Sequence, residues 1–137
     1  MANPFLVMGG VAVGVITATV GVLQVPGWIA RGHDASAMND IEQVTIAQAA
    51  ARTTSGQYET SVTALNNAET GTIIRRSNGT RIGISVNGND YVVVVQSASG
   101  RHFARVNGGL IGEGPTLSAA IAAAGGLPAG LTAPTPT

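Results

Sequence analysis

Hydrophobic residues are continuous near the start of the chain and become periodic further along. Residues 5–25 contain no charged side chain, and the first one in the chain is Arg31. At about 1.5 Å per residue, this stretch would form a helix roughly 30 Å long, which matches the hydrocarbon core of a bilayer. The pattern therefore predicts a membrane-spanning helix within a hydrophobic segment of residues 1–27.

Small residues recur on one face of this predicted helix. Gly10, Gly14 and Ala18 are four residues apart, and Thr17 and Gly21 lie on a neighbouring line. Such a face lets a second helix approach closely, so it predicts helix–helix packing. The alternative is a plain single-pass anchor in which the glycines have no role. A signal peptide is disfavoured, because the apolar run exceeds a typical signal core and no basic residue precedes it.

The predicted span ends in residues that disturb a helix. Pro26 lacks a backbone donor and crowds the preceding turn, so we expect the helix to loosen there and at Gly27. Trp28 follows at the position of an aromatic membrane anchor, and Arg31 suits lipid headgroups or water. Trp28 and Arg31 are therefore the predicted residues of the membrane interface.

Residues 28–53 show the period of an amphipathic helix. Apolar positions form one face, small or uncharged polar positions flank it, and other polar side chains lie largely off it. The face is Met38, Ile41, Val44 and Ala51, its flanks are Ala37, Thr45 and Gln48, and the positions off it are Asp40, Glu42 and Gln43. We expect this helix to continue the first one through Pro26 and to end near Gly56.

The hydrophobic period then changes from helical to alternating. Residues 72–76, 80–86, 91–97 and 101–106 read as four short strands, and their short links predict an antiparallel meander. A hairpin is predicted at Asn87-Gly88, since both residues tolerate positive φ. One face of the sheet should pack on the helix, and the other should be wet or covered by a neighbour. The residues expected against the helix are Ile82, Ile84, Val86, Val92, Val94 and Phe103, or their alternates.

Short helices are expected on either side of the strands. Ser61 is the predicted cap of a turn before them, and Pro115 falls in the first turn of a helix after them. From Gly125 onward the chain lacks periodicity and is expected to be flexible or extended. The predicted fold is thus α+β: a long N-terminal helix, half membrane and half amphipathic, packed on a small antiparallel β-meander. Residues 54–109 form the loop and head, and residues 110–137 form a Gly/Ala/Pro-rich segment.

Composition argues against nucleic-acid binding and catalysis. Formal net charge is zero, and the seven basic residues include no Lys, so no basic patch for nucleic acid is expected. His33 and His102 lack the partners and spacing of a metal site, and no cofactor or catalytic cluster is predicted. With no Cys there is no disulfide, so subunit packing is one source of stability.

Charged side chains near the start of the amphipathic helix are interpreted mainly as a solvated surface. This surface carries Asp34, Asp40 and Glu42. The alternative is that these acids form salt bridges between subunits with Arg75, Arg76 and Arg81. Asn78-Gly79-Thr80 is a weak match to an N-glycosylation acceptor.

Several motifs occur together in an order typical of one family. They are VPGWIARGHDASAMND, the Ala/Gln-rich helix that follows, the turn TTSGQY and the strand pair VVVVQSASGRHF. In this order and spacing they resemble type IV pilins and pseudopilins, in the small actinobacterial style. The resemblance implies that Phe5 lies at the methylated mature start. Pro4 replaces the family's leader glycine, and Gly9 replaces its glutamate.

The resemblance implies a structural subunit that is not an enzyme. The chain is expected to enter the membrane, and then to form a homo-oligomeric helical filament at the cell surface through its N-terminal helices. Helix packing would involve Phe5, Gly10, Gly14, Ala18, Gly21 and Pro26. One alternative is a single-pass membrane protein whose small β-rich head binds a partner and never polymerises. Another is a minor, filament-priming or phage-borne pilin relative that assembles without processing.

Overall fold

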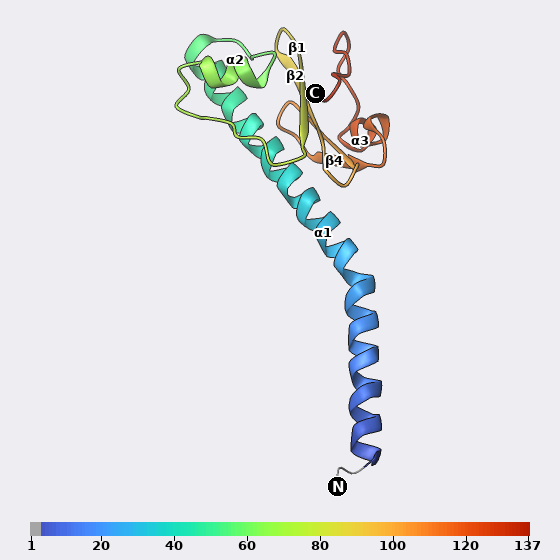
Figure 1. Ribbon diagram of the computed structural model, residues 1–137. Coiled ribbons are helices and arrows are strands. Elements are labelled where there is room, and N and C mark those ends of the chain that lie inside the picture. The colour runs from blue at the N-terminus through green and yellow to red at the C-terminus, as the bar shows by residue number, and fades with distance from the viewer. Residues whose placement is uncertain (1–3) are drawn as a thin grey trace. The chain divides into compact units, whose positions relative to one another are not determined.

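The computed structural model describes the backbone of residues 4–137 and the side chains of residues 26–137. Its elements are α1 (Pro4–Ser55), α2 (Val62–Asn67), β1 (Arg81–Asn87), β2 (Asp90–Gln96), β3 (His102–Val106), β4 (Ile111–Gly114) and α3 (Leu117–Ala123) (Figure 1). The chain divides into two compact units, one reaching to Gly32 and one from His33 to Thr137. We call the second unit the head.

The first unit is helical from Pro4 onward, and Pro26 lies inside α1. The predicted membrane span and its packing residues Phe5, Gly10, Gly14, Ala18 and Gly21 lie outside the residues whose side chains are described. Within the described part of the chain, no helix combines the length and apolar character needed to cross a membrane.

The head is an α+β fold in which the C-terminal part of α1 packs on a four-stranded antiparallel sheet, as predicted. The helix buries Ala37, Ile41, Val44, Ala47 and Ala51, at the three- and four-residue spacing of one helix face. Gly56 ends the helix with a φ of 78° and donates its N–H to the carbonyl of Arg52.

Two side chains on α1 differ from the prediction. Met38 is 40% exposed, whereas Asp40 is fully buried. The centre of the buried face follows the line through Ala37, Ile41 and Val44, and Met38 is one residue past that line. Asp40 lies at the edge of the face, where the residues before β1 supply hydrogen-bond donors to it.

The strands form a meander in the order β1-β2-β3-β4. Three predicted strands are confirmed, but the strand predicted at residues 72–76 is wrong, and the fourth strand is β4 at the other edge of the sheet. In place of a ladder, the Asn66 side chain bonds both the N–H and the C=O of Ile74. Only Ile74 of this segment is buried, and Ile73 is 67% exposed.

The first hairpin turns one residue later than predicted. Asn87 pairs with Asp90, so the two-residue loop is Gly88-Asn89. Only Gly88 of the two has a positive φ, at 61°. The favoured two-residue loops have positive φ at their first position, and Gly88 adopts it without a steric cost.

Both faces of the sheet are covered by the chain itself. Figure 1 shows α1 on one side of the sheet and α3 on the other. Tyr91, Val93 and Val95 of β2 pack toward α1 with Ile82 and Phe103. The alternate residues of β2 and β3, Val92, Val94 and Ala104, pack with residues of α3 and with Leu131. The second face of the sheet was predicted to be wet or covered by a neighbour, and that prediction is wrong. On β2, the residues that face α1 are Tyr91, Val93 and Val95, the alternates of the predicted Val92 and Val94.

Glycines in β4 bring α3 close to the sheet. A Cβ on Gly112 would lie 2.1 Å from the carbonyl oxygen of Ala120, and one on Gly114 would lie 2.7 Å from the Ala119 Cβ. Thr116 caps α3 by accepting a bond from the Ala119 N–H, so Pro115 precedes the cap and is not in the first turn. Ser61 caps α2 in the predicted way.

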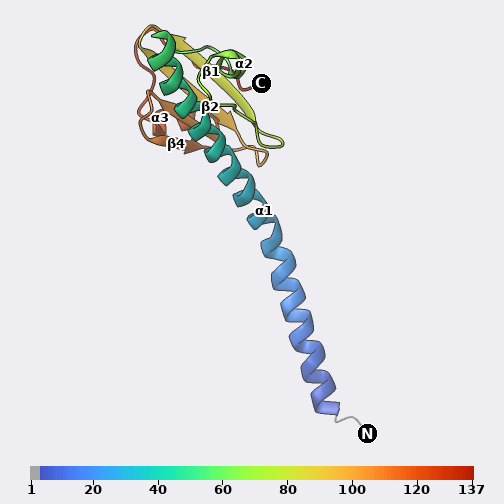
Figure 2. The same cartoon turned by 90° about the vertical axis from the view of Figure 1, so that its left-hand side faces the viewer.

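The C-terminal segment was expected to be flexible or extended, and it is extended from Leu131 onward. Leu131 is buried, and the backbone N–H and C=O of Thr137 both bond to Ile82, at 3.4 Å each. A Cβ on Gly83 would lie 2.8 Å from the carbonyl oxygen of Thr135. Residues 131–137 therefore lie against β1. Figure 2 shows that β1 is the strand next to α2.

Candidate functional site

The described interface and kink residues predicted from sequence are exposed on α1. Pro26 and Arg31 are exposed, and Trp28 is 63% exposed. The neighbouring Ile29 is 55% exposed. These residues thus place an indole, an aliphatic side chain and a guanidinium on the exposed surface of α1.

Asp40 is the most connected acidic residue of the head. Its Oδ2 accepts from the Ser77 N–H at 2.8 Å and from the Thr80 hydroxyl at 2.7 Å, and its Oδ1 accepts from the Ser77 hydroxyl at 2.7 Å. This carboxylate ties α1 to the turn that leads into β1. Sequence reasoning placed Asp40 among solvated residues. The one signal in the sequence for its burial was the group of hydrogen-bond donors in Ser77–Thr80.

The other two acids of α1 also have partners inside the head. Glu42 forms an ion pair with Arg105 of β3, with 2.7 Å between Oε2 and the guanidinium. Asp34 accepts a hydrogen bond from the Ser99 hydroxyl. Their intramolecular partners are thus not the arginines that sequence reasoning proposed for contacts between subunits.

The imidazoles do not gather with other potential ligands. No group of three His, Asp or Glu side chains in the described residues has the geometry to hold a metal ion. His33 is half-buried, and the Nδ1 atom of His102 is buried without a hydrogen-bond partner within that same range.

An aromatic pair closes one end of the core. The rings of Tyr58 and Tyr91 lie 4.6 Å apart, and the Arg52 guanidinium lies 5.3 Å from the centre of the Tyr58 ring. Burial raises the pKa of Tyr91 above its usual 10.0, Tyr58 adds to this, and Arg105 and a bond with Thr45 oppose it. Tyr91 is therefore a neutral core residue at physiological pH.

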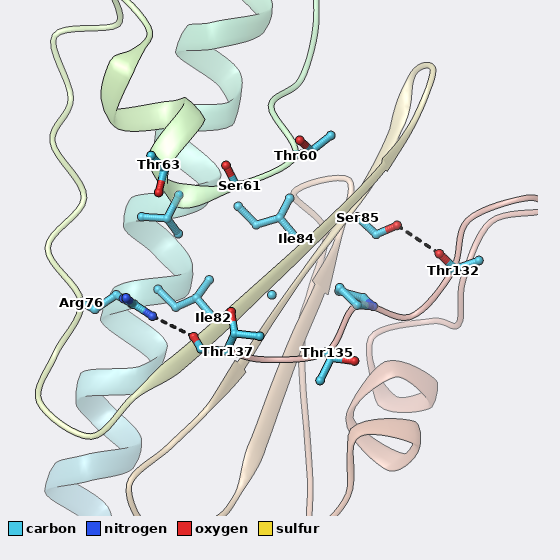
Figure 3. A pocket seen from close by; sticks show the side chains of 13 residues that line it. Thr60, Ser61, Thr63, Arg76, Ile82, Ile84, Ser85, Thr132, Thr135 and Thr137 are labelled. Atoms are coloured by element: carbon cyan, nitrogen blue, oxygen red, sulfur yellow. Dashed lines mark hydrogen bonds between the residues drawn. The ribbon is translucent and has the colours of Figure 1, made fainter.

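Two grooves of the head lie along the outer edge of β1 and past its end. One groove of about 480 Å³ lies between α2, β1 and the C-terminal segment (Figure 3). It is lined by Thr60, Ser61, Val62, Thr63, Arg76, Ile82, Gly83, Ile84, Ser85, Thr132, Pro134, Thr135 and Thr137.

A second groove of about 480 Å³ shares Thr60 with the first and continues past the end of β1. It is lined by Arg52, Gly56, Gln57, Tyr58, Thr60, Val86, Gly88 and Asn89. We call the two grooves together the β1-edge trough. Sequence reasoning did not identify it, because its walls come from three segments far apart in the chain.

The comparisons with known proteins give no relative. No family model, curated protein or solved structure matches this chain.

Proposed function

We propose that the chain is a structural subunit of a helical filament of the type IV pilus class, held in the membrane before assembly. The observation that carries the proposal is the continuity of α1 from Pro4 to Ser55. One helix contains both the uncharged residues 5–25 and the face that packs on the sheet of the head. A subunit built in this way has a hydrophobic segment for the filament core joined directly to a folded head.

The driving force would be an exchange of lipid contacts for contacts between helices. Gly10, Gly14, Ala18 and Gly21 would let neighbouring helices approach closely, and Phe5 would lie at the start of the packed segment. Pro26 would give the helix local freedom at the membrane boundary, where Trp28 and Arg31 would lie before assembly.

The outward face of α1 in the head supports contact with other subunits. Met38 is 40% exposed and Ile46 is 59% exposed on this helix. Glu42 lies four residues from each and is already engaged by Arg105 of the same head. Packing another subunit here would thus bury apolar side chains beside a charge that is already paired.

Electron microscopy of the native assembly tests the proposal directly. We expect negative staining to show filaments several nanometres wide, and an intact mass from the same sample to identify the mature N-terminus. Monomers in detergent with an uncut Met1 or Ala2 would instead support the membrane-anchored binding head. The observation that favours this second function is the β1-edge trough.

A pair of leucine variants tests the packing face. Gly14→Leu places a large side chain on the small-residue face, whereas Ala12→Leu places the same side chain about 200° around the helix. We expect Gly14→Leu to abolish filaments and Ala12→Leu to retain them, with both heads showing unchanged β-sheet circular dichroism. Normal filaments from Gly14→Leu would refute packing through this face.

A further inference from the structure

The outer edge of β1 has backbone groups that point away from the rest of the sheet. Ile82 directs its N–H and C=O outward, where both bond to Thr137. Bonding direction alternates along an antiparallel strand, so Ile84 and Val86 direct their N–H and C=O to the same edge. Within the described residues, no protein group pairs with these outward groups of Ile84 and Val86.

An unpaired strand edge is a template for another extended chain. The C-terminal segment bonds to this edge at Ile82. Thr135 and Thr132 then lie beside Gly83 and Ser85, and within the described residues neither forms a backbone bond to Ile84 or Val86. The edge therefore accepts an extended backbone at one end, and along the rest its unpaired backbone groups border a groove of about 480 Å³. The distance from Gly83 to Asn87 is roughly 13 Å at 3.3 Å per residue, which suits a segment of about five residues.

The side chains around this edge define two different walls. Figure 3 shows Ile82 and Ile84 on the side of α2, and Ser85 on the side of Thr132. Residues of an added strand would alternate in the same way, with one set on aliphatic carbon and the other beside hydroxyl groups. The trough thus favours a sequence that alternates β-branched aliphatic and small polar residues.

The charged side chains that line the trough are both arginines. Arg76 lines the first groove and Arg52 the second, and neither lining contains Asp or Glu. Arg76 donates one bond to the carbonyl of Thr137, and Arg52 donates to Gly56 and Asn89. A guanidinium has five N–H donors, so both can also bind a carboxylate. A partner with acidic residues at both ends of its extended segment complements this arrangement.

We propose that the β1-edge trough binds an extended acidic segment of a partner protein by strand addition. The backbone of the segment pairs with Ile84 and Val86, and its acidic ends lie at Arg76 and Arg52. Strand addition takes affinity from main-chain bonds and specificity from alternate side chains, and this trough offers both. The proposal does not rest on filament assembly, since every residue it uses lies in the head.

A labelled peptide tests the proposal on the full chain in non-ionic detergent. The probe is fluorescein-labelled Glu-Thr-Val-Thr-Val-Thr-Glu, and binding is measured by fluorescence anisotropy. Replacing both Glu by Gln should weaken binding by roughly fivefold, because each exposed ion pair contributes modestly. Methylating the backbone nitrogens of one alternate set of residues should weaken binding about tenfold, and methylating the other set should have little effect.

Protein variants separate the trough from the rest of the surface. Arg76→Gln should weaken binding of the acidic peptide but not of the Gln peptide, and Arg75→Gln is the matched control because Arg75 is exposed and lines neither groove. Ile84→Pro should abolish binding, since it removes an outward N–H and leaves the ladder with β2 intact.

Three results would overturn the proposal. They are equal affinity for the acidic and Gln peptides, equal effects of the two methylated sets, or affinity that falls as protein concentration rises. The last result would mean that a second copy of the chain occupies the trough. The methylated peptides use the unmodified protein, so this test stands even if a variant fails to fold.

Discussion

Replacing Asp40 should detach the start of β1 from α1. Asp40 is fully buried and accepts three hydrogen bonds, from the Ser77 N–H, the Ser77 hydroxyl and the Thr80 hydroxyl. The Thr80 hydroxyl also lies 2.8 Å from the carbonyl oxygen of Ser77, so its one proton has another acceptor after the change. The Ser77 N–H has no such alternative among the described residues, and it carries most of the expected loss.

The magnitude follows from these bonds. A hydrogen bond to a charged group contributes about 1.5–3 kcal/mol, and a buried donor left unpaired costs about 1–3 kcal/mol. Allowing for the retained Thr80 bond, Asp40→Ala should lower the free energy of unfolding by about 3–4 kcal/mol. Asp40→Asn should cost about half as much, because its one carbonyl oxygen can still accept a bond.

Urea unfolding of the full chain in non-ionic detergent, followed by far-UV circular dichroism, measures this loss. Asn39→Ala is the matched control on the same helical turn, and it should change the free energy by less than about 0.5 kcal/mol because Asn39 is exposed. Hydrogen exchange should also quicken at the Ser77 amide in Asp40→Ala. If Asp40→Ala costs under about 1 kcal/mol and Ser77 stays protected, water replaces the carboxylate and the reasoning is refuted.

Three further predictions concern the rest of the head. Gly112→Ala should lower the free energy of unfolding by about 2–4 kcal/mol, since its Cβ would lie 2.1 Å from the backbone oxygen of Ala120; a stability unchanged in urea would contradict this close packing. The raised pKa of Tyr91 means that the folded state holds this proton more tightly than the unfolded state, so stability should be intact below pH 10 and fall as pH rises above it. A pH series of thermal unfolding checks this, and Tyr91→Phe should flatten the decline in that range. Ser61→Ala should cost about 1 kcal/mol by removing the cap of α2, and an unchanged urea midpoint would show that the cap is dispensable.

Local chemistry determined much of the fold in advance. The 3.6-residue period of residues 28–53 predicted the helix and most of its buried face, and Gly56 ends it because a helix commonly stops at a glycine with positive φ. Short links between alternating segments predicted three of the four strands and their antiparallel order. Each of these signals is confined to a few neighbouring residues, so the sequence contains it whole.

Contacts between distant segments decided the remainder. The strand β2 is buried along five consecutive residues, and period alone cannot say which alternate set faces α1 when both faces are covered. The prediction at residues 72–76 failed because Asn66 binds Ile74 within that range and Asp40 binds Ser77 directly after it, and neither partner is visible in the local pattern.

The candidate site divides in the same way. The sequence by itself determined the uncharged stretch of residues 5–25 and its small-residue face, because charge and side-chain size are properties of single positions. Only the tertiary structure decided that Asp40 is buried and joins α1 to the turn before β1. It also decided that Arg52 and Arg76 lie along one strand edge. The physical reason is that burial, and the exposure of a sheet edge, depend on which distant segments cover a residue.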